Sequence, residues 1–228
     1  MSDATALTNY EEQLMKEMAN VKASLSQPSS NKISTKGKMF TLPDGTTNPG
    51  PMQCIILDWI SYNSYYEGVY DPANPQAPVC WALNKVLDDL QPSPNCPTPQ
   101  AESCKACPKD KFGSHGKGKA CKNVRRLIVV APDATIESNA MTLEVSPGAI
   151  RTFDNYALGV QRTLNTLPIR VITSIGFDAN KAYPSLTFEN PQLHENLSVM
   201  MQLREKFQHL LEREPEGATQ PENSSKAN

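Results

Sequence analysis

The chain has 228 residues, 39% of them hydrophobic, and a formal net charge of −2. This composition is compatible with one folded core and additional tails, and the lack of any run of about 18 apolar residues argues against a membrane-spanning segment. The N-terminal sequence MSDATALTNYEEQ lacks the basic start and apolar block of a secretory signal, so we expect a cytoplasmic protein. In that reducing compartment, the six cysteines favour metal binding over disulfides.

The charge is distributed unevenly along the chain. Residues 104–126 contain eight basic residues and the single acid Asp110, which gives this segment +7 and leaves −9 for the rest. A basic segment on an acidic protein is typical of an anion-binding surface, and a solvated lysine-rich loop is the alternative. The basic residues are Lys105, Lys109, Lys111, Lys117, Lys119, Lys122, Arg125 and Arg126.

The N-terminal segment predicts an amphipathic helix over residues 8–25. Thr8 and Glu11 have the spacing of a capping box, and apolar residues recur at helical spacing up to Leu25. The Ser- and Pro-containing residues that follow predict a linker. Residues 1–31 are therefore expected to be a helix with its linker, which packs on the body or engages a partner.

Short segments rich in β-branched and aromatic residues predict a mainly β domain over residues 32–190. Turn residues at 43–45 and 48–50 separate the first two segments and predict a hairpin between them. One helix is expected at 153–164. The predicted strands are 33–42, 52–62, 127–130, 141–145, 169–177 and 186–188.

A long segment, residues 70–123, interrupts this pattern. Its stretches PANPQAP and PSPNCPTPQ disfavour regular structure, and a loop of this length needs something to order it. Beyond the β domain, Asn190 and Pro191 predict the N-cap and first residue of a C-terminal helix extending over 193–211. In the predicted domain division, the C-terminal helix takes residues 191–213, and residues 214–228 are a tail whose composition predicts disorder.

Four cysteines are the candidates for ordering the long segment. In their pattern C-x23-C-x2-C-x13-C, the two-residue spacing lets one turn present two thiolates, and the outer cysteines complete a tetrahedral site. Four thiolates predict a closed structural zinc site, with an iron–sulfur cluster as the alternative. Nearby lysines are expected to lower the pKa values of the thiols, which favours metal binding. The predicted ligands are Cys80, Cys104, Cys107 and Cys121.

Cys96, His115 and Cys54 are not among the predicted ligands. Cys96 and His115 could each replace one ligand, but a loop cysteine and a solvated histidine are the simpler interpretations. Cys54 lies in the apolar run CIIL and is expected to be a small buried side chain.

The basic stretch KDKFGSHGKGKACKNVRR interleaves lysines with glycines and one aromatic ring. Lysines neutralise phosphates, glycines let the backbone approach them, and exposed rings stack on bases, so the pattern favours single-strand binding. Tyrosines and tryptophans upstream add further rings, although core packing is the commoner role for any one of them. The candidate nucleic-acid-binding residues are Lys109, Lys111, Phe112, Lys117, Lys119, Lys122, Arg125, Arg126, Trp59, Tyr65 and Tyr66.

The sequence does not predict an enzyme. The stretch GSHGKGK lacks the spacing of a Walker loop and the Ser or Thr that follows its lysine. Asp58 could be a metal-binding carboxylate, but no second carboxylate pairs with it, which leaves a nuclease poorly supported. We expect a non-enzymatic protein.

Taken together, these residues resemble a family of bacteriophage single-stranded DNA-binding proteins. The resemblance covers roughly residues 33–190, and its most specific part is the cysteine-, glycine- and lysine-rich stretch. The C-terminus departs from the strongly acidic tail of many such proteins, because its four glutamates from Glu212 onward are followed by Lys226. The resemblance is carried by KGKMFTLPDG, DWISYNSYYEGVYDPANPQAPVCWAL, CKACPKDKFGSHGKGKACKNVRRLIVV and PIRVITSIGF.

The resemblance implies an oligonucleotide/oligosaccharide-binding (OB) β-barrel with a metal-stapled insertion at about 70–123 and flanking helices. It also implies a protein that coats exposed single-stranded DNA in phage replication or recombination, in the host cytoplasm. The four cysteines take the ligand role, and DNA contact passes to Lys117, Lys119, Lys122, Arg125 and Arg126. Replication or recombination proteins are further expected partners of the end helices. The alternative function is a metal-ordered structural or adaptor protein of a phage with no direct nucleic-acid role.

Overall fold

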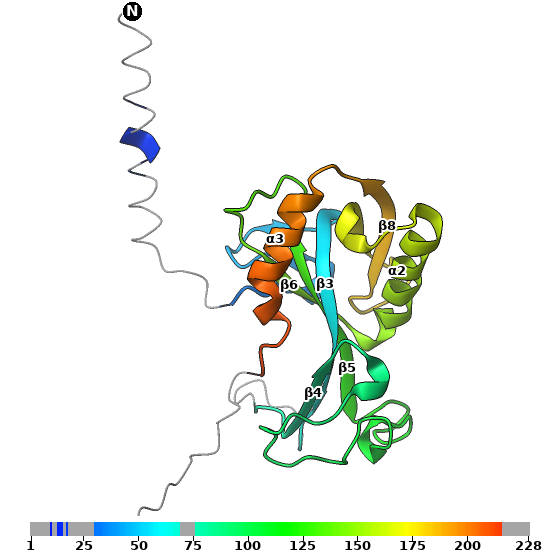
Figure 1. The fold of residues 1–228 in the computed structure, drawn as a ribbon. Helices are drawn as coiled ribbons and strands as arrows, with labels where there is room; N and C mark the ends of the chain where they lie inside the picture. The colour runs from blue at the N-terminus through cyan, green and yellow to red at the C-terminus, as the bar shows by residue number, and fades with distance from the viewer. Residues whose placement is uncertain (1–9, 11–12, 16, 18–29, 69–75, 216–228) are drawn as a thin grey trace, which may run out of the picture. The chain divides into compact units, whose positions relative to one another are not determined.

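In the computed structural model, a six-stranded antiparallel sheet carries one helix on each of its faces (Figure 1). The strand order is β6-β5-β3-β7-β8, with β4 also paired to β3, and β1 and β2 form a small second sheet. The structure describes Tyr10, residues 13–15, Glu17, residues 30–68 and residues 76–215.

The elements have the following bounds. The strands are β1 (Phe40–Thr41), β2 (Thr47–Asn48), β3 (Met52–Tyr65), β4 (Cys80–Asn84), β5 (Cys121–Val130), β6 (Met141–Val145), β7 (Val171–Phe177) and β8 (Leu186–Leu193). The α-helices are α2 (Ile150–Leu164) and α3 (Leu197–Phe207). Short 3-10 turns are η1 (Lys36–Lys38), η2 (Leu87–Asp89), η3 (Pro108–Asp110), η4 (Pro147–Ala149), η5 (Pro168–Arg170) and η6 (Gln208–Leu210).

The two ends of the chain are described only in part. The chain divides into two units, Met1–Asn31 and Lys32–Asn228. Within the predicted N-terminal helix, Tyr10, residues 13–15 and Glu17 are helical, and the remainder of that helix lies outside the described residues. Residues 216–228 of the predicted tail also lie outside them.

The expectation of a mainly β protein with helices is confirmed, whereas the expected closed barrel is not formed by the described residues. Strands β6 and β8 lie at opposite ends of the sheet and do not pair with each other. Segment 32–34 instead extends the β6 side, through an isolated bridge from Lys32 to Thr142, and a second bridge joins Ser34 to Thr41. The result is an open sheet with the β1–β2 hairpin attached at one side.

Most of the predicted strands are present. Strand β6 has the predicted bounds, and β3 and β5 continue the predicted segments by several residues at one end. Helix α2 starts three residues before its predicted start, and its left-handed C-cap is Asn165, a residue type that tolerates positive φ. Strand β7 begins two residues late, because Pro168–Arg170 forms a 3-10 turn. Strand β4 was not predicted at all.

The predicted hairpin between segments 33–42 and 52–62 is wrong. Phe40 and Thr41 pair with Asn48 and Thr47 across the Pro-Asp-Gly turn, so the hairpin closes within the turn region itself. Strand β3 pairs instead with β4, β5 and β7, all antiparallel. Segment 33–42 is further broken by the η1 turn, in which Gly37 has a positive φ of 66° that a continuous strand cannot accommodate.

The predicted start of the C-terminal helix is also wrong. Asn190 and Pro191 belong to β8, which pairs with β7 as far as the Leu193–Val171 position. The register shifts between Ile172 and Ser174, at the level of Asn190 and Pro191, and an irregularity of this kind tolerates the missing N–H of proline. Helix α3 therefore begins at Leu197, with Asn196 before it.

The core forms on both faces of the sheet. On one face, Phe153 of α2 packs against Ile56, Leu127 and Val129, and Trp59 meets its ring edge-on at 5.4 Å between centroids. On the other face, residues of α3 pack against the alternate side chains of β3 and β5. These are Met200, Leu203 and Phe207 against Ile55, Leu57, Ile128 and Val130. Because successive side chains of a strand point to opposite faces, β3 and β5 contribute apolar side chains to the core on both faces of the sheet.

Among the described residues, no helix has the length and apolar character needed to cross a bilayer.

Candidate metal centre and nucleic-acid interface

Strands β3, β4 and β5 extend beyond the helix-covered part of the sheet (Figure 1). We call this extension the arm: residues 61–65 of β3, β4, the segment 85–120, and β5 as far as Arg125. In its last row, Cys80 and Cys121 both pair with Tyr65. Paired residues share one face of a sheet, so two of the predicted ligands flank the same tyrosine.

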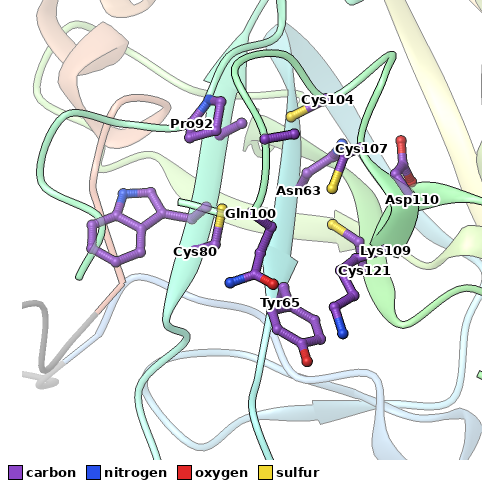
Figure 2. Close-up of a pocket in the computed structure, with 13 residues that line it drawn as sticks. Asn63, Tyr65, Cys80, Pro92, Gln100, Cys104, Cys107, Lys109, Asp110 and Cys121 are labelled. Atoms are coloured by element: carbon purple, nitrogen blue, oxygen red, sulfur yellow. The ribbon is translucent and has the colours of Figure 1, made fainter. Parts of the chain in front are cut away.

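The other two predicted ligands lie in a tight turn. The Cys107 N–H donates to the Cys104 carbonyl at 3.2 Å, and the Cys104 N–H donates to the carbonyl of Leu90 at 3.0 Å. Cys80, Cys104, Cys107 and Cys121 are all buried and line one narrow pocket, around which Figure 2 shows their sulfur atoms. The structure thus brings together four cysteines from three separate parts of the chain.

The donor set suits a closed thiolate site, but the thiols are not held in ligand geometry. Within residues 30–68 and 76–215, no group of three or more His, Cys, Asp or Glu side chains has the arrangement needed to hold a metal ion. Burial, reinforced by nearby Asp110 and the other cysteines, raises the pKa of Cys121 to about 12. Burial likewise raises the pKa of Cys104 to about 11, against a smaller lowering by Asn63. The expected lowering by lysines is therefore wrong for these two thiols, and a metal would have to displace their protons.

Neither the remaining cysteines nor His115 line this pocket, although the thiol of Cys96 interacts with that of the pocket residue Cys80. The Sγ of Cys96 accepts the Trp81 N–H at 3.0 Å and lies 3.2 Å from the Trp81 carbonyl. His115 is in an exposed turn closed by backbone hydrogen bonds with Gly118. Cys54 is buried in the sheet core as predicted, and burial raises its pKa to about 12.

Asp110 and Asn63 are among the pocket residues that the sequence interpretation missed. Asp110 lines the pocket and accepts hydrogen bonds from Lys119 at 3.0 Å and Asn123 at 2.9 Å, which ties the basic loop to β5. Asn63 is 5% exposed and lies on the Tyr65 face of β3, where its side chain interacts with Cys104. The alternation of Asn63 with Tyr65 was the signal that could have identified it.

The basic loop between Cys107 and Cys121 displays part of the predicted interface. Phe112 is 82% exposed, and Lys111 and Lys117 are also exposed. The Lys119 Nζ lies 5.3 Å from the centre of the Phe112 ring while it also pairs with Asp110. Lys109 lies over the ring of Tyr65 at 5.0 Å. A ring and several ammonium groups are therefore available on one loop.

Arg125 and Arg126 lie in the interior rather than on the surface. Arg125 is 7% exposed, forms a two-point ion pair with Asp154 of α2, and donates to Ser61 at 3.0 Å. Arg126 is 9% exposed, stacks over Tyr62 at 4.4 Å, and donates to the carbonyl of Leu211 at 3.0 Å. Burial lowers the pKa of Arg126, against a smaller opposing effect of Glu144. Their contacts are those of residues that join the helices and the C-terminal segment to the sheet.

The candidate rings of β3 differ in their exposure. Trp59 is half-buried and packs on Phe153, so its ring belongs to the helix-covered core. Tyr65 is half-buried in the cysteine pocket, and Tyr66 next to it is 44% exposed. Lys122 is exposed on β5, opposite Ser64. The rings near the basic loop are therefore Phe112, Tyr65 and Tyr66.

Asp58 is engaged in structural contacts. It is 7% exposed, and its carboxylate pairs with Lys85 and with Arg204 of α3, the latter at 3.1 Å. Its other oxygen accepts the N–H of Trp59 at 2.9 Å. Through these contacts, Asp58 links α3 and the residue after β4, Lys85, to β3 at the point where the pairing of β3 with β5 shifts in register, between Ile56 and Asp58.

Comparisons of this chain with protein-family models, with curated proteins and with solved structures find no match. The residues and contacts described above therefore carry the functional proposal on their own.

Proposed function

We propose that this protein binds single-stranded DNA through the loop between Cys107 and Cys121. The observation that carries the proposal is that this loop leaves the cysteine pocket and returns to it, while it exposes Phe112 between two solvent-facing lysines. An exposed ring can stack on a base, and ammonium groups neutralise the adjoining phosphates. Tyr65 and Tyr66 at the base of the loop add further rings.

A zinc ion held by Cys80, Cys104, Cys107 and Cys121 would order this loop. Zinc would supply only a structural link between β4, the 104–107 turn and β5, since four thiolates leave no open position. The donor set suits zinc because four buried cysteines from those three segments line one pocket, although their thiols are not in ligand geometry in this structure. In this proposal the chain is a single-strand-binding protein of a phage, which coats exposed DNA during replication or recombination and performs no catalysis.

The test is a titration of labelled oligothymidylate and of duplex DNA of equal length. We expect tighter binding to the single strand and a steep loss of affinity with salt, because several phosphates are neutralised. Phe112→Ala is expected to weaken binding about tenfold through lost stacking. The variant with Lys111→Glu and Lys117→Glu should bind more weakly still.

The matched control is Lys181→Glu, an exposed lysine in the turn between β7 and β8, at the opposite end of β3 from Tyr65. It should bind like the parent. If the loop variants also bind like the parent, the assignment of the loop is wrong. If the parent binds neither single strands nor duplex, the nucleic-acid function itself is wrong.

One observation favours the second candidate, a structural or adaptor protein. Leu193, Leu197 and Met201 are apolar and 59%, 38% and 46% exposed, at the junction of β8 and α3. Exposed apolar side chains at one junction are suited to a protein partner. This candidate predicts folded, metal-containing protein with no affinity for oligonucleotides.

A further inference from the structure

A groove lies beside the arm, on the edge of β5 that β6 leaves uncovered. Strand β6 pairs with β5 only from Arg125 to Val129, so Lys122 and the two residues after it extend past the end of β6 (Figure 1). The groove has a volume of about 450 Å³. It is lined by Lys32, Ile33, Ser34, Thr35, Lys36, Lys122, Val124, Glu144 and Ser146.

The wall opposite β5 is held firmly in place. The Ile33 N–H donates to the Thr142 carbonyl at 2.8 Å, and Ser34 and Thr41 exchange two backbone hydrogen bonds of 2.9 Å. The Lys36 N–H donates to the Ser34 hydroxyl at 3.4 Å. Segment 32–36 is therefore attached to β6 and β1, and its lysines face the groove from a preorganised backbone.

The groove carries an excess of positive charge. Three lysines against one glutamate leave a formal charge of +2. Glu144 pairs with Lys32 at 2.8 Å. Burial opposes ionisation of Glu144, but Lys32, Lys122 and Arg126 outweigh it and the pKa of the carboxyl is lowered, which keeps it charged. Glu144 thus holds Lys32 in position without cancelling the charge of the groove.

A hydroxyl group in the groove is also uncommitted. The Ser146 Oγ is buried and has no hydrogen-bond partner among the described residues. A buried hydroxyl is normally paired, so a rotation of this side chain toward the groove, which Ser146 lines, would let the hydroxyl donate to a ligand atom. The groove residues include hydroxyls and ammonium groups but no aromatic ring, which favours recognition of phosphate and not of a base.

We propose that this groove binds phosphate groups, and, resting on the proposed function, that it holds the sugar-phosphate backbone of the strand whose bases stack on the loop. The two surfaces meet at the start of β5, where Lys122, which lines the groove, directly follows Cys121 at the end of the loop and points to the opposite face of the strand. The two surfaces divide the work. The groove contributes charge, and the Phe112 loop contributes stacking.

The test compares salt dependence between variants. Lys36→Ala should weaken oligothymidylate binding roughly fivefold and reduce the slope of log K against log salt by about 0.7, the value for one phosphate on a single strand. The loss should be equal for oligodeoxyadenylate and oligothymidylate, because phosphate contacts carry no sequence information. Phe112→Ala should weaken binding with no change in the salt slope.

Glu144→Gln provides a test of opposite sign. Removing the one negative charge should strengthen binding roughly threefold at low salt, which a purely structural role of Glu144 would not produce. The control is Arg162→Ala, an exposed residue in the last turn of α2, at the other end of that helix from Ser146. It should leave both affinity and slope unchanged.

A second measurement separates failure of the groove from failure of the DNA-binding function. Tripolyphosphate, titrated into the isotope-labelled full chain, should shift the amide resonances of Ser34, Thr35 and Ser146, and Lys36→Ala should remove those shifts. If oligonucleotides bind but Lys36→Ala and Glu144→Gln change nothing and tripolyphosphate causes no shifts, the groove proposal is overturned while the function stands. If tripolyphosphate shifts these amides but no oligonucleotide binds, the phosphate site stands and the DNA-binding function falls.

Discussion

The helix-covered part of the sheet and the arm are built from the same strands but are stabilised by different means. In the former, α2 and α3 cover both faces with two large apolar clusters that contain fully buried side chains such as Phe153 and Met200. In the arm, the clusters are small, and cysteines make up much of them. Prolines and short turns replace helices there.

This difference shows why the arm needs support that the helix-covered part does not. Apolar burial contributes roughly 25 cal/mol per Å², so small clusters stabilise a long irregular segment only weakly. The arm compensates through polar ties. Asp110 joins the loop to β5, and Glu214 accepts hydrogen bonds from Ser93 at 2.5 Å and Asn95 at 3.0 Å. A metal at the four cysteines would add the remaining link.

Metal removal should produce the largest difference in stability between the arm and the helix-covered part of the sheet. Zinc binding contributes on the order of 10 kcal/mol in structural sites, so combining Cys104→Ser with Cys107→Ser should abolish metal content and expose the arm. Hydrogen exchange is expected to accelerate in β4 and at Cys121–Val124, while β6 and β7 keep their protection. Elemental analysis measures the metal directly. The control is Cys96→Ser, which should keep the metal because the serine oxygen can replace the sulfur beside Trp81. A parent protein that is purified without metal but whose arm is protected from exchange would contradict the proposed difference between the two regions.

A cavity in the helix-covered core should have the next largest effect. Phe153→Ala removes a fully buried ring that packs on Trp59 and Phe188, and should lower the free energy of unfolding by about 3–5 kcal/mol. Leu158→Ala, on the same helix but 45% exposed, should change it by less than about 0.5 kcal/mol. Urea denaturation measures both values. Equal losses in the two variants would show that α2 is not packed as described.

The Glu214 contact should have the smallest effect, and one that depends on pH. Burial raises the pKa of Glu214, but hydrogen bonds from Ser93 and Asn95 outweigh it and the pKa is lowered from its ordinary value of 4.5. The contact therefore stabilises the fold above pH 4.5, and this stability is lost as the pH falls through the folded-state pKa. Glu214→Gln should cost less than about 1 kcal/mol at neutral pH, because the group is partly exposed. In thermal melts, the difference in Tm between the parent and Glu214→Gln should shrink under acid conditions. A difference that grows instead would exclude the assigned contact.

Local patterns in the sequence were sufficient to predict those elements whose secondary structure does not depend on which distant segments pack against them. Strand β6 and helix α2 follow from alternation and helical periodicity, because each buries one continuous apolar face. The spacing of Cys104 and Cys107 likewise predicted a turn that presents both side chains to the same pocket. The mainly β character of the chain was also evident from its short β-branched segments.

Long-range contacts decided the remainder. Asn190 and Pro191 have the local signature of a helix start, but pairing with β7 keeps them in β8. Arg125 and Arg126 belong to a basic run in the sequence, but as neighbours in a strand they point to opposite faces of the sheet. Arg125 pairs there with Asp154, and Arg126 donates to the carbonyl of Leu211. A sequence records which groups are charged, whereas their burial depends on which distant segments pack against the strand. The groove of Lys32, Lys36 and Lys122 was hidden for the same reason, since its walls lie some ninety residues apart and meet only because β6 stops short of the end of β5.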